Sequence, residues 1–420
     1  MQHLDYIPES CAPMQAIPVA RTGRRFRVSE AIRDLLLVDV IHDGAHLPPE
    51  YLVDASGRKI PRSIIRQQFH LERDWGANRV ANRIASRLGL SHYYTVNTAR
   101  CLLDFGRFPG ITQEGASHLR RFAINYPFSD LLSFTQKRRL LEEHYDQISL
   151  GMDQAIQGKM VKIAVHTYDR FNASGTERPE VSLVTRALGY QLKSEMPYGV
   201  FDPLYPDILA EVTVDRILRD RVSLNLEKAG VPVAHNYPYL LPEGSPEVRH
   251  QVWSFFHWAR QRFELSYPEL ATIPESRLVW GMLMDTNLRS AEASALRDFL
   301  HMFRRPPRGR VREFTRAQRL YQRISTFVKQ DNSALVERYR QSNERPMSLG
   351  IEVRKDLVWE FDEQGRPIRL ADDRAMLISD KIAQAIAQYF REDRLEARQL
   401  REHVDNLGRV GEQLTKELSP

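Results

Sequence analysis

The sequence predicts an α/β fold in which a mixed, largely parallel sheet is sandwiched by helices and interrupted by a helical insertion. Short apolar runs alternate with segments of helical periodicity from about residue 33 to 235. The alternation resumes after residue 346, whereas nearly every segment from about 247 to 345 is helical or polar. One α/β domain with an insertion explains this pattern more simply than three separate domains.

The expected domain boundaries follow these changes in character. Residues 1–26 are expected to form an irregular N-terminal arm. Residues 27–246 and 346–392 make up the α/β domain, and residues 247–345 form the insertion, which we expect to act as a lid or subdomain. Residues 393–420 are expected to form a polar helix.

Within the α/β domain, apolar runs predict strands and amphipathic runs predict helices. Strands are expected at 33–41, 92–96, 100–105, 160–165, 181–187, 231–234 and 347–353. Helices are expected at 75–89, 134–148, 206–230 and 376–390. Gly89 is expected to cap the first of these helices, and Ile378, Ile382 and Ile386 share one face of the last.

The insertion is expected to contain amphipathic helices at 247–263 and 277–303. The arginine-rich segment 304–323 follows, with eight arginines and one acid. It lacks the regular aromatic interleaving of a surface that stacks bases. We therefore expect a solvated helix face, or otherwise a surface for an acidic peptide, a phosphorylated ligand or nucleic acid.

Composition limits the class of protein. Hydrophobic residues make up 42% of the 420 residues and charged residues of both signs 27%, which is typical of a folded globular chain. A net charge of +6 indicates an anionic ligand more than nucleic acid. Two cysteines, no signal peptide and no membrane-spanning run lead us to expect a cytoplasmic protein without a membrane partner. The oligomeric state is not predicted.

Two histidines stand at the carboxyl ends of predicted strands, where ligands bind in open α/β sheets. His42 follows the strand at 33–41, His166 follows the strand at 160–165, and Asp74 precedes the helix at 75–89. Two imidazoles and a carboxylate with an open fourth position suit catalytic zinc. A simpler interpretation is that Asp74 is only the N-cap of the helix. Likewise, both histidines could be ordinary polar residues at points where a strand leaves the core. Glu72 and His46 are alternatives to Asp74 and His42.

The strand at 347–353 carries a carboxylate on one face. Alternate residues of a strand share a face, so Glu352 and Arg354 lie opposite Leu349, Ile351 and Val353. Glu352 is a candidate general base that takes a proton from water. A simpler interpretation is that Glu352 contacts Arg354, or that this strand lies at an edge of the sheet with one face exposed to water.

Two arginines flank Asp104. Arg100 and Arg107 could grip a carboxylate through two parallel hydrogen bonds, or form an internal pair with Asp104. Asp43 and Asp104 are both candidates for orienting a ligand histidine.

The order of these motifs resembles the N-formylglutamate amidohydrolase family, zinc hydrolases related in fold to the zinc carboxypeptidases. The resemblance covers about 36–240 and 346–390. The matching motifs are His42-Asp43-Gly44 with Pro48-Pro49, Asp74-Trp75, Arg100 with Asp104 to Arg107, His166-Thr167, Asn236-Tyr237-Pro238-Tyr239, and Gly350 to Leu357. The chain departs from the family pattern at Asp43, where the family has serine, at Gly106, where it has asparagine, and in the helical insertion.

The resemblance implies a zinc-dependent amidohydrolase with one Zn²⁺ per chain, acting on an N-acyl, formyl-like amino acid or a related carboxylate-bearing amide. His42, Asp74 and His166 would hold the metal, Glu352 would be the catalytic carboxylate and Arg100 would stabilise the oxyanion. The residues expected to bind the substrate are Arg107, Arg354, Asp43, Asn236 and Tyr239. A zinc peptidase or tailoring hydrolase acting on peptides, and a non-catalytic binding protein on the same fold, are the alternatives.

Overall fold

The computed structural model describes residues 11–19, 26–109, 122–187, 201–242, 244–330, 332–342 and 344–392. The chain divides into two compact units. The first comprises Met1–Arg186, Val214–Leu241 and Met347–Pro420, and the second comprises Ala187–Thr213 and Pro242–Pro346. The second unit therefore includes residues 187–213, which lie outside the predicted insertion. The predicted helix at 393–420 lies outside the described residues.

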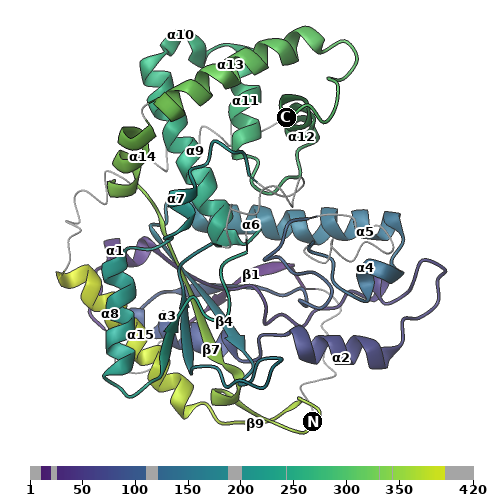
Figure 1. Ribbon diagram of the computed structural model, residues 1–420. Coiled ribbons are helices and arrows are strands. Elements are labelled where there is room, and N and C mark those ends of the chain that lie inside the picture. Colours follow the sequence, from purple (N-terminus) through teal and green to yellow (C-terminus); the bar gives the residue numbers. More distant parts are fainter. Residues whose placement is uncertain are drawn as a thin grey trace. The chain divides into compact units, whose positions relative to one another are not determined.

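The described part of the first unit contains a seven-stranded sheet in the order β1-β3-β2-β4-β7-β5-β6 (Figure 1). Neighbouring strands β3, β2, β4 and β7 are parallel, whereas β1 pairs antiparallel with β3 and β5 with β7. The strands are β1 (Met14–Pro18), β2 (Leu36–Val40), β3 (His92–Val96), β4 (Val161–Tyr168), β5 (Val181–Val184), β6 (Val233–His235) and β7 (Met347–Arg354). A short hairpin, β8 (Trp359–Phe361) and β9 (Pro367–Leu370), follows β7. The predicted mixed, largely parallel sheet is confirmed.

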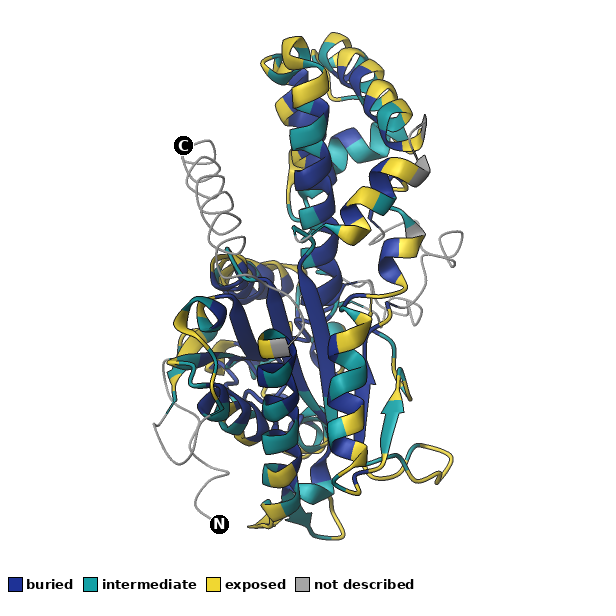
Figure 2. Ribbon diagram, turned by 90° about the vertical axis from the view of Figure 1, so that its left-hand side faces the viewer, coloured by how far each residue is buried: buried dark blue, intermediate teal, exposed yellow. Residues whose placement is uncertain are grey.

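Helices cover the sheet because its strands are apolar on both faces. In β2, Leu36, Val38 and Val40 enter one core, whereas Leu37 enters another. The first core packs against α3 (Ala77–Leu88), α8 (Arg216–Glu227) and α15 (Asp373–Glu392), and the second against α5 (Phe134–Leu140), the π-helical turn η3 (Leu141–Tyr145) and α6 (Asp146–Ile156). Figure 2 shows the central strands of the sheet buried, whereas the flanking helices carry exposed residues on their outer sides. The remaining helices of this unit are α1 (Glu30–Asp34), η1 (Pro49–Tyr51), α2 (Arg62–Glu72), α4 (Phe128–Leu131) and η5 (Lys355–Leu357).

Three predicted elements are wrong in part. Residues 100–105 form turns instead of a strand, because Leu102 and Leu103 both donate backbone hydrogen bonds to Ala99. Residues 206–230 are not one helix: α7 (Asp207–Ala210) ends, and the Asp215 side chain caps the separate helix α8. The expected irregular arm contains β1, which lies at the edge of the sheet beside β3.

The second unit is helical in its described part. Its helices are α7, α9 (Pro246–Ser266), α10 (Pro268–Ala271), α11 (Pro274–Met284), α12 (Ala291–Leu300), α13 (Val311–Gln330) and α14 (Asn332–Gln341). The predicted segment 277–303 becomes two helices, since Ser290 caps a new one. In the arginine-rich segment, Arg310 pairs with Glu313, and Arg316 with Glu275. None of the helices in the described ranges is long and apolar enough to cross a bilayer.

Candidate metal centre

Backbone geometry brings His42 and Asp74 together at the carboxyl end of β2. The chain turns after Ile41, and Gly44 passes so close to β3 that a Cβ there would lie 2.4 Å from the Asn97 carbonyl oxygen. The Asp74 amide donates a hydrogen bond to the His42 carbonyl at 3.0 Å. The N-cap of α3 is Gly76 and no side chain caps this helix, so Asp74 is placed by the turn of the strand and is not the N-cap that the sequence also allowed.

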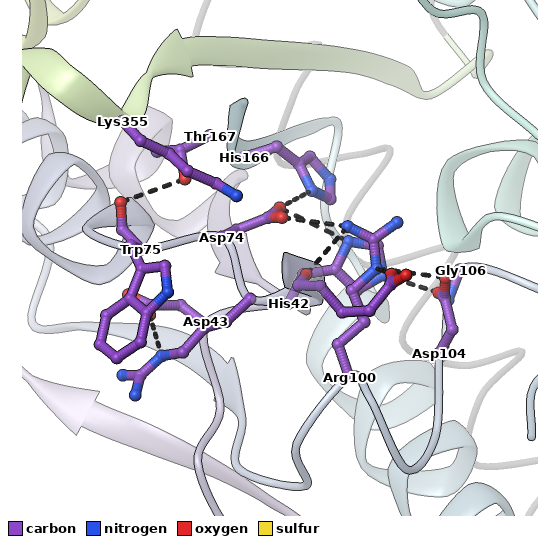
Figure 3. A network of polar contacts seen from close by, with 12 residues as sticks. His42, Asp43, Asp74, Trp75, Arg100, Asp104, Gly106, His166, Thr167 and Lys355 are labelled. Atoms are coloured by element: carbon purple, nitrogen blue, oxygen red, sulfur yellow. Dashed lines mark hydrogen bonds and ion pairs between the residues drawn. The ribbon is translucent and has the colours of Figure 1, made fainter. Parts of the chain in front are cut away.

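His166 completes the group from the neighbouring strand. It lies inside β4, near its carboxyl end, and not beyond it as the sequence suggested. Its Nδ1 is 2.9 Å from Asp74 Oδ2, and His42 Nδ1 is 3.5 Å from the same oxygen (Figure 3). One ligand atom from each of the three residues lies within 4.8 Å of the others. The side chains are 8%, 4% and 13% exposed for His42, Asp74 and His166, so this polar group is largely shielded from water.

Asp104 holds the other nitrogen of His42. His42 Nε2 lies 2.8 Å from Asp104 Oδ1, which also accepts a hydrogen bond from the Gly106 amide. Burial raises the pKa of Asp104, but His42, Arg100 and Arg107 together hold it well below the usual value. An ionised Asp104 favours the tautomer with a proton on Nε2, which leaves the Nδ1 lone pair facing Asp74.

Asp43 has a different role. Its carboxylate accepts hydrogen bonds from Arg73 Nε at 2.7 Å and from the Asn78 amide at 3.0 Å. Arg73 also lies over the Trp75 ring, 4.2 Å from the centroid. Asp43 thus ties the turn after β2 to the start of α3, and it points away from His42 (Figure 3). Of the two candidates for orienting the histidine, Asp104 is the one in contact with it.

Arg100 bridges two carboxylates beside the candidate ligands. Its Nη1 donates to Asp74 Oδ1 at 3.0 Å and its Nε to Asp104 Oδ2 at 3.2 Å. Burial lowers the pKa of Arg100, but Asp104, Asp74 and Glu72 more than offset this and raise it. The Glu72 carboxylate lies 3.7 Å from Arg100, whereas Asp74 lies with the histidines. The geometry therefore favours Asp74 over Glu72 as the carboxylate ligand.

His46 lies apart from this group. Its ring stacks on His144, with the ring centroids 6.4 Å apart. Among the described residues, the groups that could hold a metal ion comprise His42, Asp74 and His166 and do not include His46.

Glu352 stands next to His166 in the sheet. The two residues are paired in the parallel register of β4 and β7, so their side chains share a face. In the described part of the chain, no hydrogen bond to the Glu352 carboxylate is formed. Burial raises its pKa, His166 and Arg100 lower it, and Asp74 raises it further. A half-buried carboxylate without a donor beside the candidate ligands is placed to accept a proton.

The structure places the other predicted substrate-binding residues as follows. Arg107 Nε is 3.1 Å from Asp104. Arg354 pairs with Asp356 and Glu177, and not with Glu352. The Asn236 side chain accepts a hydrogen bond from the Thr185 amide. Tyr239 is 44% exposed; burial raises its pKa, with a further contribution from Glu352.

Sequence reasoning missed two residues near this group. Asn125 accepts a hydrogen bond from Arg107 and donates one to the Arg100 carbonyl, so it links the two arginines. Arg178 lies over the Tyr239 ring, 5.2 Å from its centroid. Neither residue belongs to a motif or stands at the end of a predicted strand, and no signal in the sequence marks them.

The sequence matches no protein-family model and no curated protein. Its structure is similar to the crystal structure of N-formylglutamate amidohydrolase from Ralstonia eutropha JMP134, at 13% identity and a TM-score of 0.46, over 91% of this chain and 99% of the other. It is also similar to a gene product of Agrobacterium tumefaciens, at 14% identity and a TM-score of 0.40, over 88% of this chain and 97% of the other.

Proposed function

We propose that the protein is a zinc-dependent amidohydrolase that cleaves an amide bond of an N-acyl amino acid or a related amide bearing a carboxylate. The observation that carries the proposal is the convergence of His42, Asp74 and His166 at one edge of the sheet, with Glu352 on the adjacent strand. The order of motifs in the sequence supports the same reaction.

The donor atoms fit a zinc ion. Ligands about 2.1 Å from a tetrahedral zinc are about 3.4 Å from one another. The two separations from Asp74 Oδ2, 3.5 Å to His42 Nδ1 and 2.9 Å to His166 Nδ1, bracket that value. Three protein ligands leave the fourth position that a catalytic site requires. The hydrogen bond from His42 to Asp104 is the outer contact that usually orients a ligand histidine.

Each residue then has a role that its position allows. A bound zinc ion supplies Lewis acidity, which polarises a carbonyl and lowers the pKa of a water molecule to about 7. Glu352 would be the residue that accepts a proton from water and returns it to the leaving amine. Arg100 would stabilise the oxyanion through Nη2, since Nε and Nη1 already hold Asp104 and Asp74.

Zinc content and turnover test the proposal together. The purified protein is expected to take up one zinc ion per chain and to hydrolyse N-formyl amino acids. His166→Ala should lose zinc and activity, whereas Glu352→Gln should keep zinc and lose about 10²- to 10⁴-fold in kcat. His46→Gln is the matched control, and it should keep both. A protein that takes up no zinc would contradict the proposal. Loss of zinc from the Glu352→Gln variant would contradict the assignment of Glu352 as the general base.

A further inference from the structure

The arginines expected to bind an anionic substrate group are occupied by protein carboxylates. Arg107 Nε contacts Asp104 at 3.1 Å. Arg354 makes two hydrogen bonds to Asp356 and one to Glu177, none longer than 3.0 Å. A carboxylate of the substrate would have to compete with these partners for the same donors.

Arg178 is in the opposite situation. Within the part of the chain that the structure describes, its guanidinium forms no ion pair with a carboxylate. Its Nε is buried without a hydrogen-bond partner, and its Nη1 reaches the Asp169 carbonyl only at 3.4 Å. Burying an N–H donor without an acceptor costs free energy, so this guanidinium lacks the acceptor that a bound anion would supply.

Two tyrosine rings hold the guanidinium in place. Arg178 Cζ lies 5.4 Å from the centroid of the Tyr168 ring and 5.2 Å from that of the Tyr239 ring. The Tyr168 hydroxyl is itself fixed by a 2.7 Å hydrogen bond to the Pro179 carbonyl. Aromatic faces attract a cation without consuming its N–H donors. A side-chain hydrogen bond with Tyr239 engages part of the guanidinium fork, and the buried Nε is left for a carboxylate.

The strand register places this clamp beside the candidate metal centre. Tyr168 follows His166 by two residues on β4, so both side chains lie on one face of the sheet, and Glu352 is paired with His166 on that face. Burial raises the pKa values of Tyr168 and Tyr239; Glu352 raises both further, and Arg178 lowers both. Both phenols therefore lie within electrostatic range of Glu352 and of Arg178.

We propose that Arg178, clamped between Tyr168 and Tyr239, binds a carboxylate of the substrate and makes the site selective for acidic amides. The inference rests on the proposed function for the reaction, but the binding of the carboxylate can be measured separately from it.

The kinetic test is a double-mutant cycle in which one change is made in the enzyme and the other in the substrate. The substrates are N-formyl-L-glutamate and its two monoamides, each of which lacks one carboxylate. Arg178→Gln should lower kcat/KM for the diacid about 100-fold, mainly through KM. For the monoamide that lacks the recognised carboxylate, Arg178→Gln and the wild type should agree within about 2-fold. Arg178→Lys should recover part of the loss.

Arg170→Gln is the matched control on the same loop. It removes the same charge, but Arg170 is 48% exposed and pairs with Glu177. We expect it to leave all three substrates unaffected. An equal loss with all three substrates in the Arg178→Gln protein, or no loss with any of them, would overturn the inference.

Binding separates the failure of this inference from the failure of the proposed function. Glutarate is titrated calorimetrically into the full-length, zinc-supplied protein. Its Kd should rise at least about 10-fold in Arg178→Gln but not in Arg170→Gln. If the wild type hydrolyses none of the amides and glutarate binding still depends on Arg178, the reaction is wrong and the anion site stands. If the two variants bind glutarate equally, or not at all, the anion site is wrong even where hydrolysis is observed.

Discussion

His42 Nε2 lies 2.8 Å from Asp104 Oδ1, and His42 Nδ1 faces Asp74, so a single imidazole connects two buried carboxylates. This relationship separates the candidate ligand carboxylate, Asp74, from the carboxylate that orients the imidazole, Asp104. It also distinguishes Asp104 from Asp43, which follows His42 directly in the sequence but bonds to Arg73 and Asn78.

Replacing Asp104 by asparagine should weaken zinc binding about 10- to 100-fold, because the neutral amide holds the imidazole less firmly and supports its basicity less. Competition with a chromogenic chelator measures the affinity. Asp43→Asn is the control: it should change zinc affinity less than 2-fold while lowering the free energy of unfolding. Equal losses of affinity in the two variants would contradict the assigned difference.

The buried pair of Asp39 and Lys162 should respond strongly to the loss of one partner. Lys162 Nζ is 2.8 Å from Asp39 Oδ1, and both side chains are 1% exposed. Lys162→Met should lower the free energy of unfolding by about 3–5 kcal/mol, because Asp39 is left buried without its counter-charge. The double variant with Asp39→Leu should recover most of that loss in urea denaturation. If the double variant is less stable than the single one, the loss comes from packing and not from the charge.

The ion pairs between α3 and α15 should make the free energy of unfolding depend on pH in the acidic range. Asp380 accepts hydrogen bonds from Arg83 and Arg87. Burial raises the pKa of Asp380, but the two arginines outweigh burial and lower it. A carboxyl whose pKa is lowered on folding stabilises the protein above its unfolded value of about 3.9, and this contribution is lost as the pH falls through the folded pKa.

Asp380→Asn should therefore cost about 1 kcal/mol at pH 7, and less as the pH falls below about 4. Urea denaturation of both proteins between pH 3 and 7 measures the difference. A difference that does not change with pH would show that the carboxylate charge is not its source.

Gly76 should be the less replaceable of two glycines with similar backbone angles. Gly76 has φ +90° and precedes α3, and a Cβ there would lie 2.5 Å from Val358 Cγ1. Gly158 has φ +73°, and a Cβ there would meet nothing within 4 Å. Gly158→Ala should lower the free energy of unfolding by about 1–2 kcal/mol, the cost of holding alanine in the left-handed conformation. Gly76→Ala should cost more in thermal or urea unfolding, and equal costs would mean that Val358 moves aside freely.

Several elements were predictable because their signals are local. Helix α3 has apolar residues four apart and ends at Gly89, which adopts the left-handed conformation expected of a cap. Ile378, Ile382 and Ile386 are fully buried on one face of α15, as their spacing indicated. The strand predicted at residues 100–105 is wrong because its local signal is overridden. The segment is apolar enough for a strand, but its backbone turns at Ala99, and Leu103 forms an isolated bridge with Ile124.

The sequence by itself determined which side chains stand at the carboxyl edge of the sheet. His42, His166 and Glu352 are placed there by the ends and alternation of apolar strands, which are properties of neighbouring residues. Only the tertiary structure decided what each charged group contacts. Asp104 reaches His42 across 62 positions, Asp43 turns to Arg73, and Arg178 lies between two tyrosines without a carboxylate partner among the described residues. The reason is physical: hydrogen bonds and ion pairs extend about 3 Å, and segments distant in sequence come that close only after the sheet and its loops have packed.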